Sequence, residues 1–590
     1  MLEPRYRWVL PEPADPDPAL VAAAAAHELS PRLAGLLARR GVEGPEALAA
    51  FFGHPEASLH DPALLPDAAL LGERIRRARR DGEGILVFGD FDADGLTGLA
   101  IVTSALRQLG CDAEPYVPSR LEEGHGLSRR AVDAAAAGGR RLIVTVDTGT
   151  TSGAEIAAAA AAGIDVVVTD HHRVPAELPP AVAVVNAHRR DSRYPDRRLA
   201  GSGIAFKVAQ LLLADLPDGA ARALDLADLA AIGTVADVTP IVGENRAIAR
   251  IGLERLRRAP RPGIAALLAR AGIAPAAVDL ETVGFAIAPR LNAAGRIGEA
   301  VDAARLLLAT DPTEAATLAD RLEAVNLERR ELSKEVLAAA RLAVVDATLA
   351  GAGPSAIVVR GPWPVGIVGL VAARLSEETG LPAIVGAELD GVVRASCRNG
   401  GPLDLAGALE SCGDLLVRHG GHRGAAGFEI ESARWDEFRV RFEALAGAVA
   451  PADPRPVLRI DLALPVRELG YGLHRELGRL EPTGPGNEAP LLAVLGATVV
   501  RVRETRGGHT QLTLRRDRDV IDAIAFGRDD LAAALREGDL VDLAGRLESR
   551  SWGGVESLRL DVRDVAPAGS PGPARPLAGI PVEATVEAAR

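Results

Sequence analysis

The stretch VFGDFDADGLTG, from Val87 to Gly98, sets three carboxylates, Asp90, Asp92 and Asp94, at alternate positions directly after an apolar run. Aspartate and glycine are ordinary turn residues, so one interpretation is a simple loop that ends a strand. Carboxylates this close, however, raise one another's pKa unless a cation lies between them. The stretch therefore predicts a strand followed by an acidic loop, and it raises the question of which cation that loop holds.

Two further apolar runs end in the same way, the first in an aspartate and the second in an aspartate and two histidines. They are RLIVTVDTG (141–149), with Asp147, and DVVVTDHH (165–172), with Asp170, His171 and His172. Helical patterns separate these runs, and strands that alternate with helices are typical of a doubly wound parallel sheet. Ligands bind beyond the carboxyl ends of such strands, so we expect these side chains along one edge of one sheet.

The side chains at this edge suit a pair of divalent metal ions. Carboxylates with a neutral imidazole are ligands for Mg²⁺ and Mn²⁺, and the histidine favours Mn²⁺. Asp237, after an Ala-rich stretch that we expect to be a helix, supplies a further acid to the same edge. Two ions ~3.5–4 Å apart can generate hydroxide and bind both the attacking and the leaving oxygen of a phosphoryl displacement. Chance rarely ends three neighbouring strands in this way, so the pattern favours a two-metal site over ordinary turns.

The rest of the chain predicts further domains, as a length of 590 residues allows. Residues 311–346 lack glycine and keep apolar residues at helical spacing, which predicts a long connecting helix. A second α/β pattern follows, and then a run of short strands typical of an OB-fold barrel. The predicted units are an N-terminal helical extension (1–79), the doubly wound domain (80–310), the connecting helix (311–346), a smaller α/β domain (347–450), an OB-fold domain (451–565) and a disordered tail (566–590).

The composition narrows the class of protein. A net charge of −13 argues against a protein that coats nucleic acid by bulk attraction, but it allows a local basic groove. The three cysteines show no paired spacing, which argues against a disulfide framework or a zinc cluster and fits a reducing compartment. No secretory signal is visible, and no apolar run approaches the ~20 residues that a membrane span needs. We therefore expect a soluble, cytoplasmic protein.

The acidic motifs carry a resemblance to a known group of enzymes. DFDADG, TVDTG, VTDHH and GTVADVTPI resemble the four motifs of the DHH phosphoesterase superfamily. Further stretches narrow the resemblance to the RecJ family of single-strand-specific 5′→3′ DNA exonucleases; they are YVPSRLEEGHGLS (116–128), LAGSGIAFK (199–207), APRLNAAGRI (288–297), GGHRGAAGF (420–428) and LEPTGPGNEAP (480–490). The resemblance covers about residues 75–563, and it implies the order DHH domain, long helix, DHHA1 domain and OB-fold.

The resemblance implies a role for each residue of the metal edge. Asp170 is expected to orient His171, because a metal-bound histidine usually donates its other ring N–H to such a partner. His172 matches the residue that faces the scissile phosphate in relatives. The positions that match metal ligands are Asp92, Asp94, Asp147, His171 and Asp237, with Asp90 as an additional acid. The implied cofactor is a pair of Mn²⁺ or Mg²⁺ ions.

The resemblance also implies where the DNA binds. A pocket for the terminal 5′-phosphate is expected from Arg120, Ser396 and Arg398, because arginine is the bidentate donor for phosphate. Other candidate DNA contacts are Arg290, Arg296 and His422 near phosphates, and Phe526 and Trp552 in a single-strand groove of the barrel. The alternative for each arginine is a surface ion pair, for His422 a plain loop, and for Trp552 a place in the barrel core.

The chain departs from the family pattern at two positions. Pro364 follows Trp363 where relatives commonly have a histidine, and Cys397 replaces a glycine between Ser396 and Arg398. Ser396 and Arg398 are themselves retained, so the phosphate pocket is still expected.

Together these observations predict a metal-dependent exonuclease that degrades single-stranded DNA from its 5′ end to mononucleotides, in recombination and repair. The alternative is a DHH–DHHA1 phosphodiesterase of short oligonucleotides or cyclic dinucleotides, a class that generally lacks the OB-fold. A pyrophosphatase of the superfamily is disfavoured because Phe88 stands where that class has a histidine, and an inactive DNA-binding scaffold is disfavoured because every ligand position is filled. By resemblance alone, the expected partners are a single-strand-binding protein, a helicase and mismatch-repair factors, and the protein is expected to be a monomer.

Overall fold

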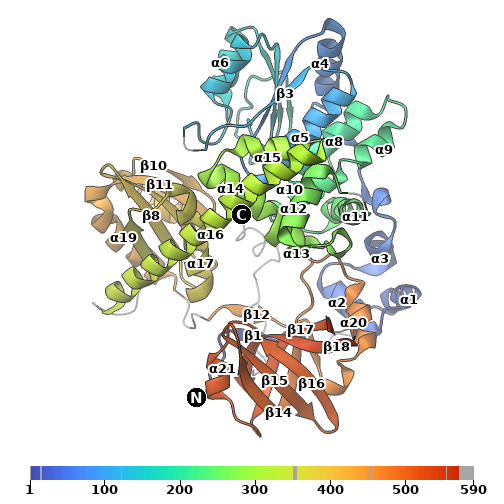
Figure 1. Cartoon of the computed structure of the whole chain (residues 1–590), viewed down its shortest axis with the longest axis vertical. Helices are drawn as coiled ribbons and strands as arrows, with labels where there is room; N and C mark the ends of the chain where they lie inside the picture. The colour runs from blue at the N-terminus through green and yellow to red at the C-terminus, as the bar shows by residue number, and fades with distance from the viewer. Residues whose placement is uncertain are drawn as a thin grey trace.

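The computed structural model describes residues 2–12, 16–120, 122–258, 260–349, 355–450, 453, 455–552 and 555–569. Figure 1 shows an α/β unit at the top, a smaller α/β unit at the left and a β-barrel at the bottom. Helix α16 (Pro312–Leu349) runs between the two α/β units, in the region for which the sequence predicts a connecting helix. Of the predicted disordered tail, residues 566 and 567 belong to the last barrel strand, and 570–590 lie outside the described residues.

The first α/β domain is built on a five-stranded sheet in which all neighbouring strands are parallel. In spatial order the strands are β3 (Ala113–Tyr116), β2 (Ile85–Gly89), β4 (Leu142–Val146), β5 (Asp165–Thr169) and β6 (Ala183–Val185). Strands β2 and β4 are buried along their whole length, as expected when helices cover both faces of a parallel sheet. The predicted doubly wound sheet is confirmed.

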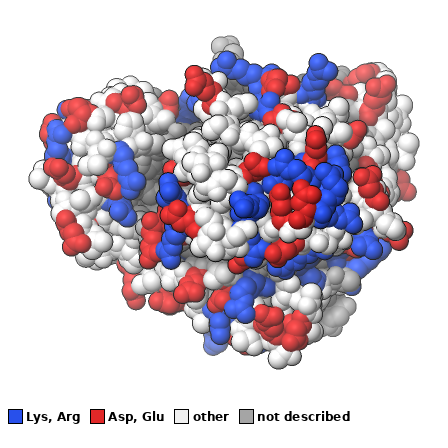
Figure 2. Space-filling view, turned by 90° about the horizontal axis from the view of Figure 1, so that it is seen from above, with Lys and Arg blue, Asp and Glu red and all other residues white. Residues whose placement is uncertain are grey.

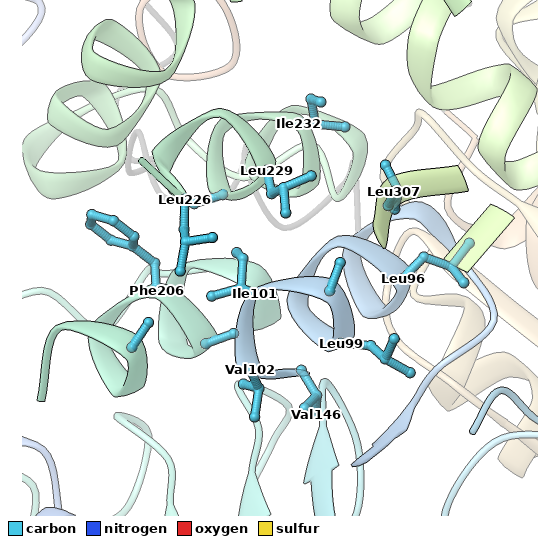
Figure 3. Close-up of a cluster of buried hydrophobic side chains, with 14 of the residues drawn as sticks. Leu96, Leu99, Ile101, Val102, Val146, Phe206, Leu226, Leu229, Ile232 and Leu307 are labelled. Atoms are coloured by element: carbon cyan, nitrogen blue, oxygen red, sulfur yellow. The ribbon is translucent and has the colours of Figure 1, made fainter. Parts of the chain in front are cut away.

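Different helices cover the two faces of this sheet. On one face lie α6 (Arg129–Ala137) and α7 (Gly153–Ala161), and on the other lie α4 (Ala68–Asp81), α5 (Ala93–Gln108) and α8 (Gly201–Leu213). Figure 3 shows side chains of α5, α8 and α10 (Ala227–Ala236), among them Ile101, Phe206 and Leu229, in one cluster, with Val146 of β4 below α5. This core fixes the helices whose ends border the carboxyl edge of the sheet.

The long helix α16 joins two hydrophobic cores. Leu318 and Leu322 near its start pack into the core of the first domain, whereas Val336 and Ala340 pack into the core of the second. The two α/β domains are therefore held by opposite ends of one rigid element. The other helices of the first domain are α9 (Gly219–Leu224), α11 (Gly243–Arg258), α12 (Pro262–Ala271), α13 (Leu280–Thr282), a π-helical turn (Val283–Ile287), α14 (Ala288–Ile297) and α15 (Ala300–Leu308).

The second α/β domain has a mixed five-stranded sheet of order β10-β11-β9-β8-β7, in which only β7 and β8 are parallel neighbours. Its strands are β7 (Ile357–Gly361), β8 (Ala383–Leu389), β9 (Val392–Arg398), β10 (Arg418–Gly421) and β11 (Ala425–Glu431). Its helices are α17 (Val365–Thr379), α18 (Leu405–Glu410) and α19 (Trp435–Ala448). Its small α/β fold agrees with the sequence prediction.

The C-terminal unit is a barrel, as predicted. Five strands run in the order β14-β15-β16-β18-β17, and pairing of β17 with β14 closes the ring. They are β14 (Leu492–Thr505), β15 (His509–Arg516), β16 (Asp519–Ala525), β17 (Leu540–Trp552) and β18 (Val555–Pro567), accompanied by β13 (Leu462–Leu464), α20 (Tyr471–Gly478) and α21 (Asp530–Ala534). Within the described ranges, no helix has the length and apolar character needed to cross a membrane.

The N-terminal segment forms short helices and one strand that pack against the barrel. Residues 7–9 form a strand, β1 (Arg7–Val9), which pairs in parallel with β12 (Val457–Arg459) some 450 residues later. Its helices α1 (Pro18–Ala26), α2 (Pro31–Arg39) and α3 (Gly44–Phe52) share one hydrophobic core with the barrel. The sequence did not reveal this, because a three-residue strand has no measurable period and its partner lies in another domain.

Buried Asp564 of β18 anchors this N-terminal strand to the barrel. Its carboxylate accepts hydrogen bonds from the backbone N–H groups of Arg5 and Tyr6, both at 3.1 Å, and from Nε1 of Trp8 at 2.8 Å.

We expect Asp564→Ala to destabilise the barrel unit by about 3 kcal/mol, because buried donors lose their acceptor. The measurement is the midpoint of urea unfolding, with exposed Asp519→Ala as the control. Equal midpoints for the two variants would contradict this account.

Candidate metal centre and phosphate pocket

The predicted metal ligands gather at the carboxyl edge of the parallel sheet. Asp90 directly follows β2, Asp147 directly follows β4, and His171 lies two residues after β5. Asp92 is the N-cap of α5, where one carboxylate oxygen accepts the N–H groups of Asp94 and Gly95 at 3.0 Å each. Asp237 caps the C-terminus of α10. Five separate elements therefore bring their ends to one place.

Three sets of side chains at this edge are close enough to share a metal ion. In each set the ligand atoms lie within 4.8 Å of one another. Nε2 of His171 lies 3.0 Å from Oδ1 of Asp147 and 3.9 Å from Oδ2 of Asp94, so His171 stands at the centre of the cluster. The sets are Asp90, Asp92 and Asp147; Asp94, His171 and Asp237; and Asp147, His171 and His172.

Glycines leave the room that these carboxylates need. A Cβ at Gly201 would lie 2.4 Å from Oδ1 of Asp147, and a Cβ at Gly233 would lie 2.5 Å from Oδ1 of Asp94. The first turn of α8 also binds Asp94, whose oxygens accept the N–H groups of Gly201 at 2.7 Å and Ser202 at 2.9 Å. Helix N-termini favour carboxylates in this way. Gly201 and Gly233 thus account for two of the glycine-containing motifs in the sequence.

The electrostatics of the cluster call for a cation. Burial, with Asp90 and Asp94 nearby, raises the pKa of Asp92 to about 6. Burial also raises the pKa of Asp94, and burial with four neighbouring aspartates raises the pKa of Asp147 well above its usual value. Oδ1 of Asp90 is buried and accepts no hydrogen bond from the described residues. Buried carboxylates that lie this close together are unfavourable without a cation. Carboxylate oxygens with one imidazole are ligands that fit a pair of Mn²⁺ or Mg²⁺ ions.

Asp147 also adopts a backbone conformation that is rare for a side-chain-bearing residue. Its φ is 61°, in the left-handed region. Such strain persists where the surrounding structure enforces it, commonly at functional sites. Here the conformation turns the carboxylate from the end of β4 toward His171.

Asp170 contacts both histidines of the DHH motif. Asp170 was expected to orient His171, but its carboxylate accepts a hydrogen bond from ring atom Nδ1 of His172 at 2.8 Å and reaches His171 through the backbone N–H, also at 2.8 Å. The carboxylate folds back over the turn that follows it, as aspartate does in Asx turns, and so meets the side chain two residues later.

This pairing sets the charge of both groups. Burial alone would lower the pKa of His172, but the hydrogen bond and charge of Asp170 outweigh it and raise the pKa to about 9. Burial would likewise raise the pKa of Asp170, yet the bond from His172 holds it below its usual range. The side chain of His172 is 55% exposed at the mouth of the site.

His125 is a site residue that the sequence analysis did not single out. Its Nδ1 lies 3.2 Å from Oδ2 of Asp90, and its ring packs on Phe91 with centroids 4.5 Å apart. The available signal was its place in the family stretch YVPSRLEEGHGLS. His125 reaches the metal edge from a loop that folds over it from β3, and one sequence gives no way to see that approach.

The arginines predicted to bind phosphate converge beside the metal edge. Arg120 lies over the ring of Phe91, with its guanidinium carbon 5.0 Å from the ring centroid. Burial lowers the pKa of Arg120, and the nearby charges of Asp90 and Asp92 oppose this effect only in part. Nη1 of Arg398 donates to the hydroxyl of Ser396 at 3.0 Å. Burial lowers the pKa of Arg296 to about 10, and the nearby charges of Arg120, Arg329 and Arg398 contribute. The pocket therefore joins both α/β domains.

This arginine cluster suits a phosphate. Within the described part of the chain, Arg120, Arg296, Arg329 and Arg398 form no ion pair, whereas Arg290 pairs with Glu323. Cations crowded together without carboxylates are stabilised by a bound anion. Arg329 of α16 was not predicted, because the sequence shows only that it interrupts an apolar stripe. Two glycines near the start of α17 permit the close packing: a Cβ at Gly366 would lie 2.3 Å from the carbonyl oxygen of Arg296, and a Cβ at Gly369 would lie 3.1 Å from the hydroxyl of Ser396.

The remaining predicted DNA contacts are Arg290, His422, Phe526 and Trp552. The guanidinium of Arg290 is occupied by Glu323 and the carbonyl of Ala286. His422 is exposed in the turn between β10 and β11. Phe526 is 48% exposed at the end of β16, with the guanidinium of Arg559 5.5 Å from its ring centroid. Trp552 ends β17, and its side chain is outside the described part of the structure.

The surface charge supports local rather than global attraction of nucleic acid. Figure 2 shows basic and acidic residues interspersed on the face seen from above, without one broad basic field. This agrees with the net charge of −13. Affinity for an anionic strand must then come from confined positive sites such as the arginine cluster.

The fold and this site define a metal-dependent phosphoesterase of the DHH class, and comparisons with known proteins agree. The family described as "DHH family, N-terminal domain" matches residues 84–234, and "RecJ OB domain" matches residues 460–564. The single-stranded-DNA-specific exonuclease RecJ of Bacillus subtilis is 34% identical over 572 residues, covering 96% of this chain and 71% of the relative. RecJ of Thermus thermophilus is 37% identical, covering 88% of this chain and 75% of the relative. The chain belongs to the RecJ family.

Solved structures extend the similarity to three dimensions. RecJ of Thermus thermophilus in complex with Mn²⁺ superposes with a TM-score of 0.81 at 33% identity, covering 95% of this chain and 80% of that one. The same enzyme in complex with Mg²⁺ gives a TM-score of 0.75 at 31% identity, with 95% and 78% coverage. Relatives of this fold thus bind the two metals that the donor set favours.

We expect Mn²⁺ to raise the melting temperature of the protein, because it binds the folded state and neutralises the buried carboxylates. Asp147→Asn is expected to abolish most of this shift and to raise the melting temperature of the metal-free protein, since one repelling charge is removed at nearly constant shape. The measurement is thermal unfolding with EDTA and with Mn²⁺. A metal-induced shift of equal size in both proteins would place the ions elsewhere.

Proposed function

We propose that this protein is a single-stranded-DNA-specific exonuclease that depends on Mn²⁺ or Mg²⁺ and removes mononucleotides from the 5′ end. The observation that carries the proposal is that two groups of side chains lie next to each other: the complete carboxylate–histidine set, and an arginine cluster that forms no salt bridge among the described residues. The first suits a divalent-metal hydrolase, and the second suits a terminal phosphate beside the cleaved bond. The names of the RecJ relatives describe the same substrate.

In the proposed mechanism, Asp90, Asp92, Asp94, Asp147, His171 and Asp237 hold the metal ions. When bound, the pair of ions supplies an activated water and neutralises charge on the phosphodiester. Nδ1 of His172 is engaged by Asp170, which leaves the protonated Nε2 to donate a hydrogen bond to a non-bridging oxygen of the scissile phosphate. Such a donor stabilises the charge that develops in the transition state.

The arginine cluster supplies the proposed polarity. A terminal 5′-phosphate carries more charge than an internal phosphodiester, and Arg120, Arg296 and Arg398 meet it with three guanidinium groups. A strand seated there places its next phosphodiester at the metal edge. In this proposal the bound terminal phosphate acts as a stop, so that each cut removes one nucleotide.

A groove offers a path for the rest of the strand. A cavity of about 1480 Å³ is lined on one side by residues 235, 236 and 238, which flank Asp237, and on the other by residues 546–549 of β17. The barrel and the end of α10, next in sequence to Asp237, therefore line one cavity. This arrangement favours a long single strand over short oligonucleotides or cyclic dinucleotides, which need no third domain.

The place of action and the partners follow from the substrate. We propose a cytoplasmic enzyme of DNA recombination and repair, acting on single strands that a helicase exposes and a single-strand-binding protein covers. The N-terminal strand and helices complete the barrel unit within the same chain, which fits a monomer.

The first expected outcome concerns polarity. With Mn²⁺ and a single-stranded DNA 60-mer, mononucleotide should be released at once from a 5′ label and not from a 3′ label, while a duplex of the same sequence stays intact. Asp147→Ala should lower the rate at least 10³-fold, because the metal set loses a shared ligand. Hydrolysis of dinucleotides but not of the 60-mer would instead identify a short-oligonucleotide phosphodiesterase.

The second expected outcome concerns the terminal phosphate. Arg398→Ala should reduce the preference for a 5′-phosphorylated over a 5′-hydroxyl strand by roughly 10- to 100-fold, the effect of losing one charge-assisted contact. The control is Arg394→Ala on the same strand, because Arg394 is exposed and pairs with Glu429. The ratio of kcat/KM for the two strands is the measurement. An unchanged ratio in Arg398→Ala would exclude this pocket as the origin of polarity.

A further inference from the structure

One family stretch remains unused by the proposed chemistry. LEPTGPGNEAP (480–490) lies between α20 and β14, where the chain enters the barrel. We call residues 480–490 the docking loop. It contacts the first α/β domain through α11 and through the turn between α10 and α11.

Arg246 of α11 is the centre of this contact. Its Nη1 donates to the carbonyl oxygens of Leu480 at 3.1 Å and Pro482 at 2.8 Å, and its Nη2 donates to the carbonyl oxygen of Glu481 at 2.8 Å. Three consecutive carbonyls of the docking loop therefore point at one guanidinium. The side chain of Asn487 donates to two of the same oxygens, at 3.0 and 2.9 Å, and holds the loop in that shape.

The surroundings of Arg246 are unusual for a cation. The residue is 5% exposed, and the described residues include no ion-pair partner for it. Its guanidinium instead lies against the ring of Phe51 from α3, with the carbon 3.9 Å from the ring centroid. Burial and the charge of Arg250 lower its pKa to about 9. A buried charge stabilised only by carbonyl dipoles and a ring is costly, so the contact tolerates little displacement.

The same loop contacts the turn that carries a metal ligand. Asp237 ends α10, and four residues later the N–H of Ile241 donates to the carbonyl oxygen of Pro485 at 2.7 Å. A Cβ at Gly484 would lie 2.7 Å from Cγ1 of Ile241, so the surfaces meet without a gap. The docking loop therefore spans from Arg246 back toward Asp237, within one turn and the start of one helix.

We propose that Arg246 is a positioning residue that clamps the barrel, through the docking loop, to the turn that bears Asp237. The clamp holds the barrel beside the groove, so that a long strand contacts barrel and metal edge together. This inference rests on the proposed function for its consequence, but the clamp itself is a property of the fold.

The test compares two variants that open the clamp from opposite sides. Arg246→Ala removes the guanidinium, and Gly484→Val pushes the docking loop off Ile241 without removing a buried side chain. Arg246→Lys keeps the charge but loses the planar fork that meets three carbonyls, and it is expected to fall between wild type and Arg246→Ala. The control is Arg255→Ala, on the same helix but paired with Asp225 at the surface.

Two measurements are made on the full-length protein at saturating Mn²⁺. In the first, KM for a single-stranded 40-mer should rise at least tenfold in Arg246→Ala and Gly484→Val, while kcat/KM for a 5′-phosphorylated trinucleotide, too short to reach the barrel, changes less than twofold. In the second, hydrogen exchange of residues 238–246 and 480–490 should become faster in both variants. Arg255→Ala should match wild type in both measurements.

Several results would overturn the clamp. They are an unchanged KM for the 40-mer in both variants, an equal loss on both substrates, and unchanged exchange at both segments. If the wild-type protein cuts neither substrate, the proposed function fails, but the exchange measurement still decides whether Arg246 clamps the loop.

Discussion

The mutual repulsion of buried carboxylates is the constraint on which this structure depends. Asp92, Asp94 and Asp147 lie together at a sheet edge where burial raises the pKa of each of them. Helix N-termini, close-packed glycines and the ring of His171 surround these carboxylates. A divalent cation completes their stabilisation. A parallel sheet is suited to this task, because its strands all deliver their carboxyl ends to one side.

A cluster of positive charges lies beside the metal edge. Arg120, Arg296, Arg329 and Arg398 come from a loop, from α14, from α16 and from β9, and their charges disfavour one another. A cluster of acids that needs cations thus faces a cluster of cations that needs an anion. The proposed substrate, a phosphate strand bound to metal ions, would satisfy both clusters. The rigid helix α16 keeps the clusters in register, since its two ends belong to the cores of the two domains.

The C-terminal barrel is held to the rest of the chain by contacts between residues that are distant in sequence and close in space. Asp564 binds the N-terminal strand, helices α1–α3 share the barrel core, and Arg246 holds the docking loop. The barrel is therefore part of a continuous framework around the groove.

The sequence by itself determined the parallel sheet, the barrel and the members of the metal edge. Strands and their terminal acids are local patterns, and consecutive parallel strands place those acids on one side whatever the details of packing. Only the tertiary structure decided that the carboxylate of Asp170 binds the ring of His172. The same is true of the ion pair between Arg290 and Glu323 and of the place of Arg329 in the arginine cluster. It is also true of the pairing of residues 7–9 with 457–459. These outcomes depend on which residue, distant in sequence, packs next to a given group in the folded chain. That is settled by packing between segments hundreds of residues apart, and no periodicity in the chain records it.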